Sequence, residues 1–477
     1  MRRRMAGVGE AGFLPFLFLA CALPVLALAA LLTPPGQSPD EPAHLVRTES
    51  LLHGALLLTR KPRFDPGSGK MDEQVGMKID AGLLAAGFGI TTQIDGHPVV
   101  TKTDAAQLRQ IPWAHQRIFA GIPNTATYFP LAYLPPAIGL GVGKLLGASP
   151  FTCVILARLA DAAAYLMIGA AALALAAYGR ALLLAVLLLP MSLFLGATLD
   201  QDGILVALTC LACAGITRGT PGGRRLGFAA FLVVLLAKPP YLPLLGLFAL
   251  PLAWPGFWRR AGEVILASLP VLIWAAIIVL FVTVPFGKPP YHPGPLFAGA
   301  DVLMDHTNTA ANLHILLADK ARFVTLPVHT LVLWGAAKLA EMVGVLGLLQ
   351  VTFPHWFYGL WWGAVVAAWL GGFVSPRPNP LPLRVCLLNG AVVLAVIILT
   401  AWLIMISFYL SWTNVGMDFI DGLQGRYALL LLPFLLFAAP ALGGWLPEWV
   451  AALPVVLLGG WDIGYIPLKI MWFYYLH

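Results

Sequence analysis

The stretch GFLPFLFLACALPVLALAALL, residues 12 to 32, decides the class of the fold. It contains no charged residue and is long enough to cross a bilayer as one helix, which takes about 20 apolar residues. Similar apolar runs recur to the C-terminus. Of the 477 residues 59% are hydrophobic and 11% are charged, whereas soluble proteins carry about 25% charged residues. We therefore predict an all-α integral membrane protein, with residues 1–477 as a single polytopic domain.

The residues before this stretch orient it in the membrane. Three arginines follow the first methionine, and basic residues stay on the cytoplasmic side, so the N-terminus is predicted to be cytoplasmic. Ala-Leu-Ala at 27–29 resembles a signal-peptide cleavage site, but the apolar run exceeds the usual signal core of about 7–15 residues. An uncleaved first helix is favoured, and the chain after Leu32 starts outside.

The other basic residues exclude one class of partner and set the topology. The net charge is +7, but Lys and Arg collect in short loops between apolar runs, which indicates membrane orientation and no nucleic-acid partner. Residues 33–150 form a predicted first extracytoplasmic loop with juxtamembrane helices. Its apolar part, 128–147, is predicted to lie at the membrane surface, because a crossing there would put the arginine-rich loop 215–225 outside. Its prolines favour the same reading.

The remaining apolar runs give about 11 transmembrane helices, together with a second extracytoplasmic section at 285–354 that carries interfacial helices. After the first helix, the runs with definable limits lie at residues 158–178, 226–237, 241–254, 263–284, 356–373, 385–408 and 449–467.

This topology brings ionisable residues from distant parts of the chain to one side. Charged groups at membrane depth are costly and usually functional. Because the basic loops alone fix the topology, the shared side was not chosen to suit these residues. We predict a site near the outer interface built from Asp40, Glu41, Arg158, Asp200, Asp202, Lys238 and Arg426.

The acidic pair Asp40 and Glu41 follows the first helix closely. Ser38-Pro39-Asp40-Glu41 has the pattern of a capping box with proline at the first helical position, in which the Glu41 carboxylate bonds back to the Ser38 amide. Glu41 is then structural or functional with equal weight, whereas Asp40 keeps a free carboxylate and is favoured as functional. His44, one turn later, positions Asp40, joins a metal or is only an interfacial polar residue.

The three basic candidates each have a structural alternative. Arg158 either contacts phosphate, snorkels to the interface or pairs with Asp161 one turn later. Lys238 lies between two short apolar pieces, in a break that only a cavity or protein interior tolerates, and it too could snorkel. Arg426 either contacts donor phosphate or pairs with an aspartate of the preceding loop. Gln424 and Tyr427 flank it as supporting residues.

The external section 285–354 is rich in histidine and aspartate, with no recognised spacing of metal ligands. A solvated lid or an acceptor platform is favoured there over a metal site. Its titratable residues, with one at its border, are His292, Asp301, Asp305, His306, His314, Asp319, His329 and His355.

Five pieces of the chain together resemble a bacterial membrane family catalogued as domain of unknown function 2142. They occur in order between residue 39 and about residue 436 and read PDEPAHLVRTESLLHG, TYFPLAYLPPAIGLGVGK, LLLPMSLFLGATLDQDG, AKPPYLPLL and QGRYALLLLPFLL. The acidic pair also resembles the Asp-Glu of GT-C glycosyltransferases, which use polyprenyl-phosphate sugars.

The GT-C resemblance implies GT-C-like architecture and an inner-membrane enzyme with its active site on the outer face. It implies Asp40 as catalytic base, Arg158 at the second span, and Asp200 or Asp202 as the next acidic residue, with the closer family favouring Asp202. Lys238 and Arg426 would join Arg158 at the donor phosphate. A carboxylate suits deprotonation of an acceptor hydroxyl, and basic side chains suit a leaving phosphate.

The implied partners are a polyprenyl-phosphate-linked sugar, an extracytoplasmic glycan or lipid acceptor, and membrane lipids. No cofactor is required, although the Asp-Gln-Asp of residues 200–202 has a spacing that a divalent ion uses. The main alternative is a non-catalytic transporter or polysaccharide assembly component, and another is a polymerase or ligase acting on the same lipids. A transporter more often carries mid-membrane charges and internal repeats, so charges gathered at one face favour the enzyme.

Overall fold

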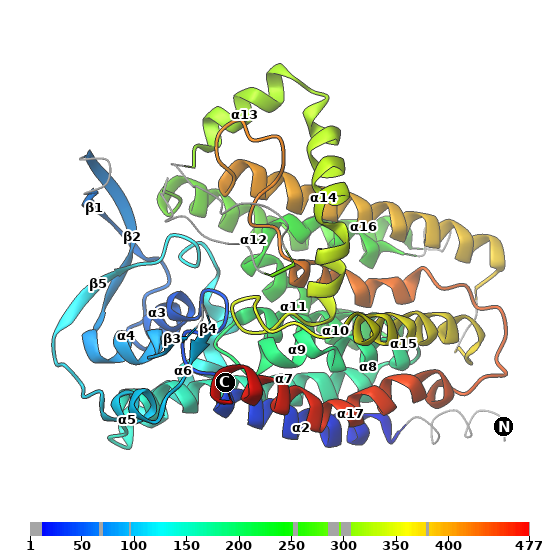
Figure 1. Ribbon diagram of the computed structural model, residues 1–477. Coiled ribbons are helices and arrows are strands. Elements are labelled where there is room, and N and C mark those ends of the chain that lie inside the picture. Colours follow the sequence, from blue (N-terminus) through cyan, green and yellow to red (C-terminus); the bar gives the residue numbers. More distant parts are fainter. Residues whose placement is uncertain are drawn as a thin grey trace.

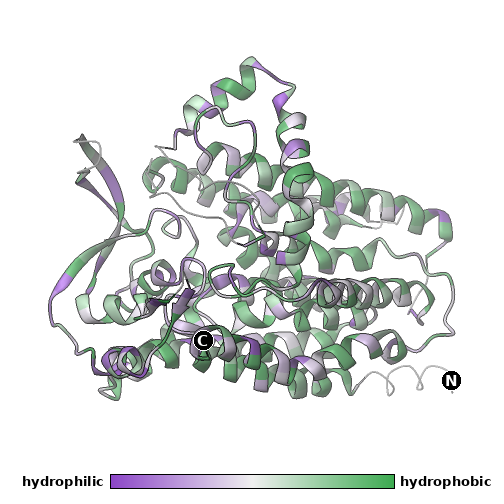
Figure 2. Ribbon diagram, viewed as in Figure 1, coloured by the Kyte–Doolittle hydropathy of each residue, from purple (hydrophilic) through white to green (hydrophobic). Residues whose placement is uncertain are grey.

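The computed structural model describes residues 12–65, 70–94, 97–250, 256–284, 295–296, 307–377 and 381–476. Most of these residues are helical, and long helices run side by side as a bundle with short strands at one end (Figure 1). Hydropathy follows the same division, since the bundle is mainly apolar and the strands carry much of the polar surface (Figure 2). The predicted helical class is right for the bundle.

Within the described ranges, seven helices are long and apolar enough to cross a membrane. The first coincides closely with the stretch 12–32. The seven are α2 (Leu14–Leu32), α7 (Pro150–Leu175), α12 (Phe257–Phe281), α14 (Arg322–Gly344), α15 (His355–Val374), α16 (Leu383–Ser411) and α17 (Glu448–Tyr475). The pair α9 (Pro190–Gly196) and α10 (Gln201–Thr217) makes an eighth if it is one span bent by 117°.

The predicted number of about 11 spans is not confirmed, and the difference has a structural origin. Several apolar runs fold into elements shorter than about 20 residues, namely α8 (Arg180–Leu188), α11 (Pro221–Ala237), η2 (Pro239–Ala249) and η3 (Gly425–Phe437). Two of these, η2 and η3, are 3-10 helices. A 3-10 helix rises about 2 Å per residue, so the 13 residues of η3 extend about 26 Å.

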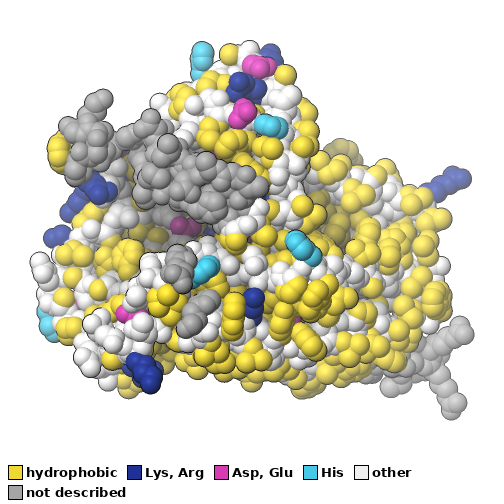
Figure 3. Space-filling model, in the orientation of Figure 1, with side chains coloured by type: hydrophobic (Ala, Val, Ile, Leu, Met, Phe, Trp, Pro, Cys, Tyr) yellow, Lys and Arg dark blue, Asp and Glu magenta, His cyan; other side chains and the backbone are white. Residues whose placement is uncertain are grey.

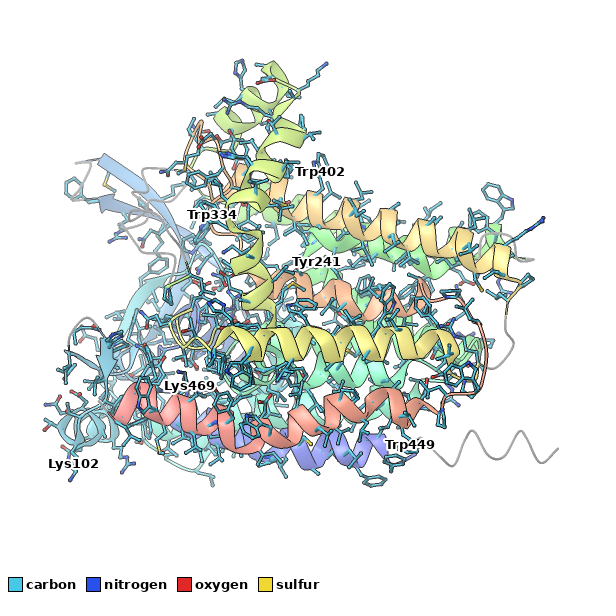
Figure 4. All side chains as sticks on the ribbon, turned by 45° about the vertical axis from the view of Figure 1, so that its right-hand side comes forward. Lys102, Tyr241, Trp334, Trp402, Trp449 and Lys469 are labelled. Atoms are coloured by element: carbon cyan, nitrogen blue, oxygen red, sulfur yellow. The ribbon has the colours of Figure 1, made fainter. Side chains whose placement is uncertain are left out.

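Helix α14 lies within the section predicted to be external. By length and composition it is long enough to cross a membrane, yet in Figures 1 and 4 it runs across the direction of α15, α16 and α17. Trp334 on α14 and Trp402 on α16 mark the region where the two helices meet in Figure 4, and Trp402 Nε1 donates to the Phe323 carbonyl oxygen at 2.5 Å. The section predicted to be external therefore contains a helix that is long and apolar enough to cross a membrane itself.

Section 33–150 contains strands, so the all-α prediction is wrong there. β1 (Thr59–Asp65), β2 (Lys70–Asp80) and β5 (Arg117–Gly121) form a three-stranded antiparallel sheet in the order β1-β2-β5, and β3 (Thr92–Ile94) pairs with β4 (His97–Val99). Val75, Met77 and Ile79 are buried, and Lys78 between the last two is exposed, as the two-residue period of a strand predicts. The helices of this section are α3 (Glu41–Leu52), α4 (Ala81–Phe88) and α5 (Lys102–Gln110).

The apolar segment 128–147 folds as η1 (Pro130–Tyr133) and α6 (Leu134–Leu145). α6 has 12 residues, too few to cross a bilayer, in agreement with the prediction that this segment does not span. It packs closely on α7 through glycine: a Cβ on Gly139 would lie 2.3 Å from the Leu156 carbonyl oxygen. Small residues at such a contact let two helix backbones approach.

The basic loops gather at the end of the bundle opposite the strands. Arg180 Nη1 lies 3.3 Å from Glu448 Oε2, and Arg377 stacks on the Tyr178 ring at 4.8 Å. α17 starts at this end, near Trp449, and runs to Lys469 beside the strands (Figure 4). Hydrophobic side chains cover much of the intervening surface (Figure 3).

A buried ion pair joins α3 to α7 at the other end. The Arg158 guanidinium is fully buried and donates two hydrogen bonds of 2.7 Å to the Glu41 carboxylate. It also donates to the carbonyl oxygens of Ala30 and Thr33, at 3.0 and 2.6 Å. Such a bidentate pair is strong and directional. It fixes the end of α2 against the start of α3.

This pair corrects two predictions. Glu41 does not close a capping box with Ser38, since the N-cap of α3 is Asp40 and Glu41 accepts from Arg158 and from the N–H groups of Gly36 and Leu199, at 2.8 and 3.2 Å. Arg158 pairs with Glu41 rather than with Asp161, and its burial leaves no room for snorkelling. A carboxylate more than 100 positions away along the chain is the better partner because its two oxygens accept from Nε and Nη2 along one edge of the guanidinium.

We expect Arg158→Met to destabilise the protein strongly, because it leaves the Glu41 carboxylate buried without a cation, at a cost of about 3–5 kcal/mol. The midpoint of thermal unfolding in detergent, followed by tryptophan fluorescence, measures this. Arg384→Met removes an exposed arginine and serves as the control. Equal midpoints for the two variants would contradict the structural role of the pair.

Candidate functional site

Arg426, at the start of η3, lies among three aspartates. Its Nη1 donates to the Asp200 carboxylate, its Nη2 lies 3.7 Å from Asp40 Oδ2, and its Nε lies 3.9 Å from Asp202 Oδ2. Arg426, Asp200 and Asp202 are all buried. The predicted convergence of these distant residues is therefore present in the fold, and Asp40, Asp200 and Asp202 surround the Arg426 guanidinium.

Lys238 joins the same cluster from the break between α11 and η2. Its Nζ lies 2.6 Å from Asp202 Oδ1 and 4.6 Å from the centre of the Tyr427 ring. Pro239 and Pro240 follow directly, and a residue before proline is disfavoured in helical conformation, which explains why α11 ends here. Asp202 thus contacts both cations.

The two aspartates of residues 200–202 have different local roles. Asp200 is the N-cap of α10, and its Oδ1 accepts the Asp202 N–H at 2.9 Å. Asp202 lies in the first turn. Negative charge is favoured at a helix N-terminus by the helix dipole. The sharp bend between α9 and α10 therefore presents both carboxylates to Arg426.

The His44 side chain contacts the cluster at Asp200, whereas its bond to Asp40 is between backbone groups. Its Nδ1 is 2.7 Å from the Tyr133 hydroxyl and its Nε2 is 3.9 Å from Asp200 Oδ1. Tyr128 stacks on the other side of the imidazole, with ring centres 6.3 Å apart. Burial raises the pKa of the Tyr128 and Tyr133 phenols well above the ordinary value, so both stay neutral. The expectation that His44 positions Asp40 is corrected to a contact with Asp200.

Asp40 is the accessible carboxylate of the cluster. Its side chain is 38% exposed, and its Oδ1 accepts a hydrogen bond of 2.8 Å from Asn124 Nδ2. Its backbone is left-handed, with φ of 59°, a conformation that Asp and Asn tolerate better than most side chains. This turn directs the carboxylate away from α3, since it makes no capping bond.

A cavity of 1680 Å³ opens beside the cluster. Among the described residues that line it, Asp40 and Lys238 carry charge. Arg158 and Arg426 do not line it. Apolar side chains of α12 and α16 form one wall: Ala275, Ile278, Val279, Ile404 and Phe408. The polar side chains that line the cavity include Asn124, Tyr128, Gln424 and Tyr427.

The structure brings most predicted site residues together and separates two. Gln424 and Tyr427 line the cavity beside Lys238, whereas Glu41 and Arg158 form their own buried pair. Asn124, Tyr128 and Tyr133 were missed by the sequence analysis. They lie in or beside the segment 128–147, and the available signal was the occurrence of their polar groups at the start of an apolar run.

Metal binding receives no support from the part of the chain that the structure describes. No group of three His, Cys, Asp or Glu side chains there has an arrangement that could hold a metal. At the cluster of three aspartates, the Arg426 guanidinium takes the central position. His292, Asp301, Asp305 and His306 lie outside the described residues. His329 Nδ1 is 2.8 Å from the Asp418 carbonyl oxygen.

Comparison with known families identifies the chain. It matches the family described as predicted membrane protein (DUF2142) over residues 23–438, and therefore belongs to that family. Together with its long apolar helices, this makes it a membrane-embedded protein. No curated protein and no solved structure matches it.

We expect two substitutions at Asp40 to distinguish the effect of its left-handed backbone on stability from the effect of its carboxylate. Asp40→Ala puts a side chain with no polar group into a left-handed turn, which costs about 1–2 kcal/mol, whereas Asp40→Asn keeps the conformation and an oxygen that accepts from Asn124. Thermal unfolding should show a lower midpoint for Ala and an unchanged one for Asn. Asp418→Ala, at an exposed position with an ordinary φ, is the control; an Ala effect no larger than this would overturn the strain argument.

Proposed function

We propose that the protein is a glycosyltransferase with GT-C-type chemistry, which transfers a sugar from a polyprenyl-phosphate donor to an extracytoplasmic glycan or lipid acceptor. One observation carries the proposal: a single large cavity exposes a carboxylate, Asp40, and an ammonium group, Lys238, next to an apolar wall on α12 and α16. These are the groups that a lipid-linked phosphate sugar and a hydroxyl acceptor require.

Asp40 is the general base of the proposed reaction. Its carboxylate takes the proton of the acceptor hydroxyl while the hydroxyl oxygen attacks the anomeric carbon of the donor sugar. The bond from that carbon to the phosphate oxygen breaks, and the lipid phosphate leaves with the electron pair. A base in this position contributes about 100- to 10,000-fold to the rate. Asn124 supports the role because its amide holds one carboxylate oxygen in place.

Lys238 binds the donor phosphate in this scheme. Lys238 lines the cavity, and its ammonium group has donors beyond its bond to Asp202, so it can stabilise the charge that grows on the leaving phosphate. Arg426 has an indirect role: it is buried, does not line the cavity, and holds Asp200 and Asp40 in place. Arg158, a predicted phosphate ligand, has its hydrogen bonds taken up by Glu41 and backbone carbonyls, and its proposed role is structural.

The apolar wall accommodates the polyprenyl chain. α12 exposes much of its apolar surface, including Ile273, Val279 and Leu280, and such a face is stable only against lipid or another apolar partner. A chain lying between α12 and α16 would reach the cavity from the bilayer with its phosphate near Lys238. The basic loops at the opposite end support a cytoplasmic N-terminus and a site on the outer face.

A transporter or assembly component remains the second candidate, because the same cavity would bind the lipid without transferring sugar. The exposed, hydrogen-bonded carboxylate of Asp40 favours the enzyme, since a carboxylate at the cavity can take the proton of an acceptor hydroxyl.

We expect Asp40→Asn to abolish glycan modification in cells that lack the chromosomal gene. Envelope glycans and lipids are compared by mass spectrometry after complementation with wild type, Asp40→Asn or the control Asp418→Asn. Wild type and the control restore the modification and Asp40→Asn does not. Full restoration by Asp40→Asn contradicts the catalytic base and favours the transporter; deletion without any glycan or lipid change overturns both functions.

We expect Lys238→Met to weaken binding of decaprenyl phosphate, a sugar-free probe, to the purified protein in nanodiscs. Loss of one charge-assisted hydrogen bond corresponds to about 10- to 100-fold in Kd. Lys238→Arg keeps the charge and should retain most of the affinity. The exposed Lys320→Met is the control, and a Kd for Lys238→Met equal to that of this control would exclude Lys238 as the phosphate ligand.

A further inference from the structure

The loop between α16 and η3, residues 412–424, reaches the site along one face of α14. Thr330 Oγ1 accepts the N–H of Ile420 at 2.9 Å, and the Glu341 carboxylate accepts the N–H of Gly425 at 2.6 Å. Thr330 and Glu341 are about three helical turns apart, so both point from the same face. α14 therefore supports this loop along its length, up to the residue before Arg426.

An aromatic contact lies between these two hydrogen bonds. The rings of Trp334 and Phe419 meet edge to face with centres 4.7 Å apart, and Trp334 projects from α14 in Figure 4. Contacts of this kind contribute to packing beyond the area they bury. The loop is thus held by α14 through polar and aromatic contacts together.

The backbone of Gly425 rests directly on the last turn of α14. A Cβ at this position would lie 2.1 Å from the Lys338 carbonyl oxygen and 2.7 Å from Glu341 Cβ. No side chain fits there without moving one of the two elements. The contact that Glu341 makes is therefore a close one between main chain and carboxylate, with no freedom for the peptide to shift.

Glu341 is placed to act on its neighbours rather than on a ligand. It is buried, its Oε1 accepts from Lys338 Nζ at 2.8 Å, and it does not line the cavity. The residues on either side of Gly425 both belong to the site. Gln424 lines the cavity with its buried Oε1 lacking a hydrogen-bond partner in the described structure, and Arg426 pairs with the aspartates.

We propose that Glu341 is a positioning residue that holds the Gln424–Arg426 peptide, so that Gln424 lines the cavity where the donor binds and the Arg426 guanidinium reaches its aspartates. This inference rests on the proposed function for the nature of the donor. The positioning itself is a property of the fold and is measured without a donor.

The chain offers a matched control at the opposite end of the bundle. Glu448 is also buried, accepts the N–H of a glycine, Gly179, at 2.5 Å, and pairs with a basic residue, Arg180. Glu448→Ala therefore removes the same set of interactions far from the site. A general loss of stability affects both variants alike, whereas a positioning effect is confined to Glu341→Ala.

The test combines a local and a binding measurement on the full protein in nanodiscs. Hydrogen–deuterium exchange of peptides covering 418–427 reports on the loop, and the Kd for decaprenyl phosphate reports on the site. We expect Glu341→Ala to speed exchange and raise the Kd, each by about tenfold, since it removes a charge-assisted bond. Glu341→Gln, which keeps an acceptor for the Gly425 N–H, should restore most of both, and Glu448→Ala should change neither.

The outcomes separate the inference from the proposed function. Unchanged exchange at 418–427 in Glu341→Ala, or an equal change in Glu448→Ala, overturns the positioning role. Faster exchange with an unchanged Kd also overturns it, because the loop would then move without consequence for the site. If wild type does not bind decaprenyl phosphate, the proposed function fails. Hydrogen exchange alone then decides whether Glu341 holds the loop: slow exchange restored by Glu341→Gln supports the positioning role, and exchange that stays fast overturns it.

Discussion

Compensation of buried charge governs the architecture of this protein. A guanidinium removed from water is tolerated only when acceptors surround it, and the fold supplies them twice within a short distance. Arg158 receives the Glu41 carboxylate and the carbonyls that end α2, and Arg426 receives Asp200 with Asp202 and Asp40 nearby. Both arrangements require α2, α3, α7, α10 and η3 to meet at one end of the bundle. The helices are consequently fixed where they meet.

The two arrangements differ in whether any of their charged residues line the cavity. The Glu41–Arg158 pair is sealed on every side and its side chains have no contact with the cavity. The cluster around Arg426 is sealed on the protein side but ends in two accessible groups, Asp40 and Lys238. The carboxylate of Asp40 and the ammonium group of Lys238 thus belong to the same cavity, and their ion-pair partners on the protein side hold each of them in place. This is a rigid support for reacting groups, in which the surrounding ion pairs fix orientation rather than bind the ligand.

The convergence of the site residues was predictable from the sequence because charged residues are sparse in a membrane protein. The basic loops alone predicted that Asp40, Asp200, Lys238 and Arg426 share one side, and the fold brings them together. Pairings were not predictable: the local pattern of Ser38 to Glu41 indicated a capping box, but a bidentate bond to Arg158 outweighs the single backbone bond that the box provides. The strands of section 33–150 were missed because whole-chain hydropathy hid the two-residue alternation at Val75, Met77 and Ile79. The predicted number of spans is not confirmed, because apolar composition does not distinguish an α-helix from the 3-10 geometry of η2 and η3.

Because η3 is a 3-10 helix, its length and the ion pairs of Arg426 at its first turn depend on each other. An α-helix rises about 1.5 Å per residue against about 2 Å for a 3-10 helix, so conversion of the 13 residues of η3 to α geometry would shorten the segment by about 6 Å. Arg426 stands at the first turn, and contraction toward the far end would draw it away from Asp200 and Asp202. Its ion pairs therefore fix the first turn of η3 against the start of α10, so that the position of Arg426 depends on the length that η3 keeps.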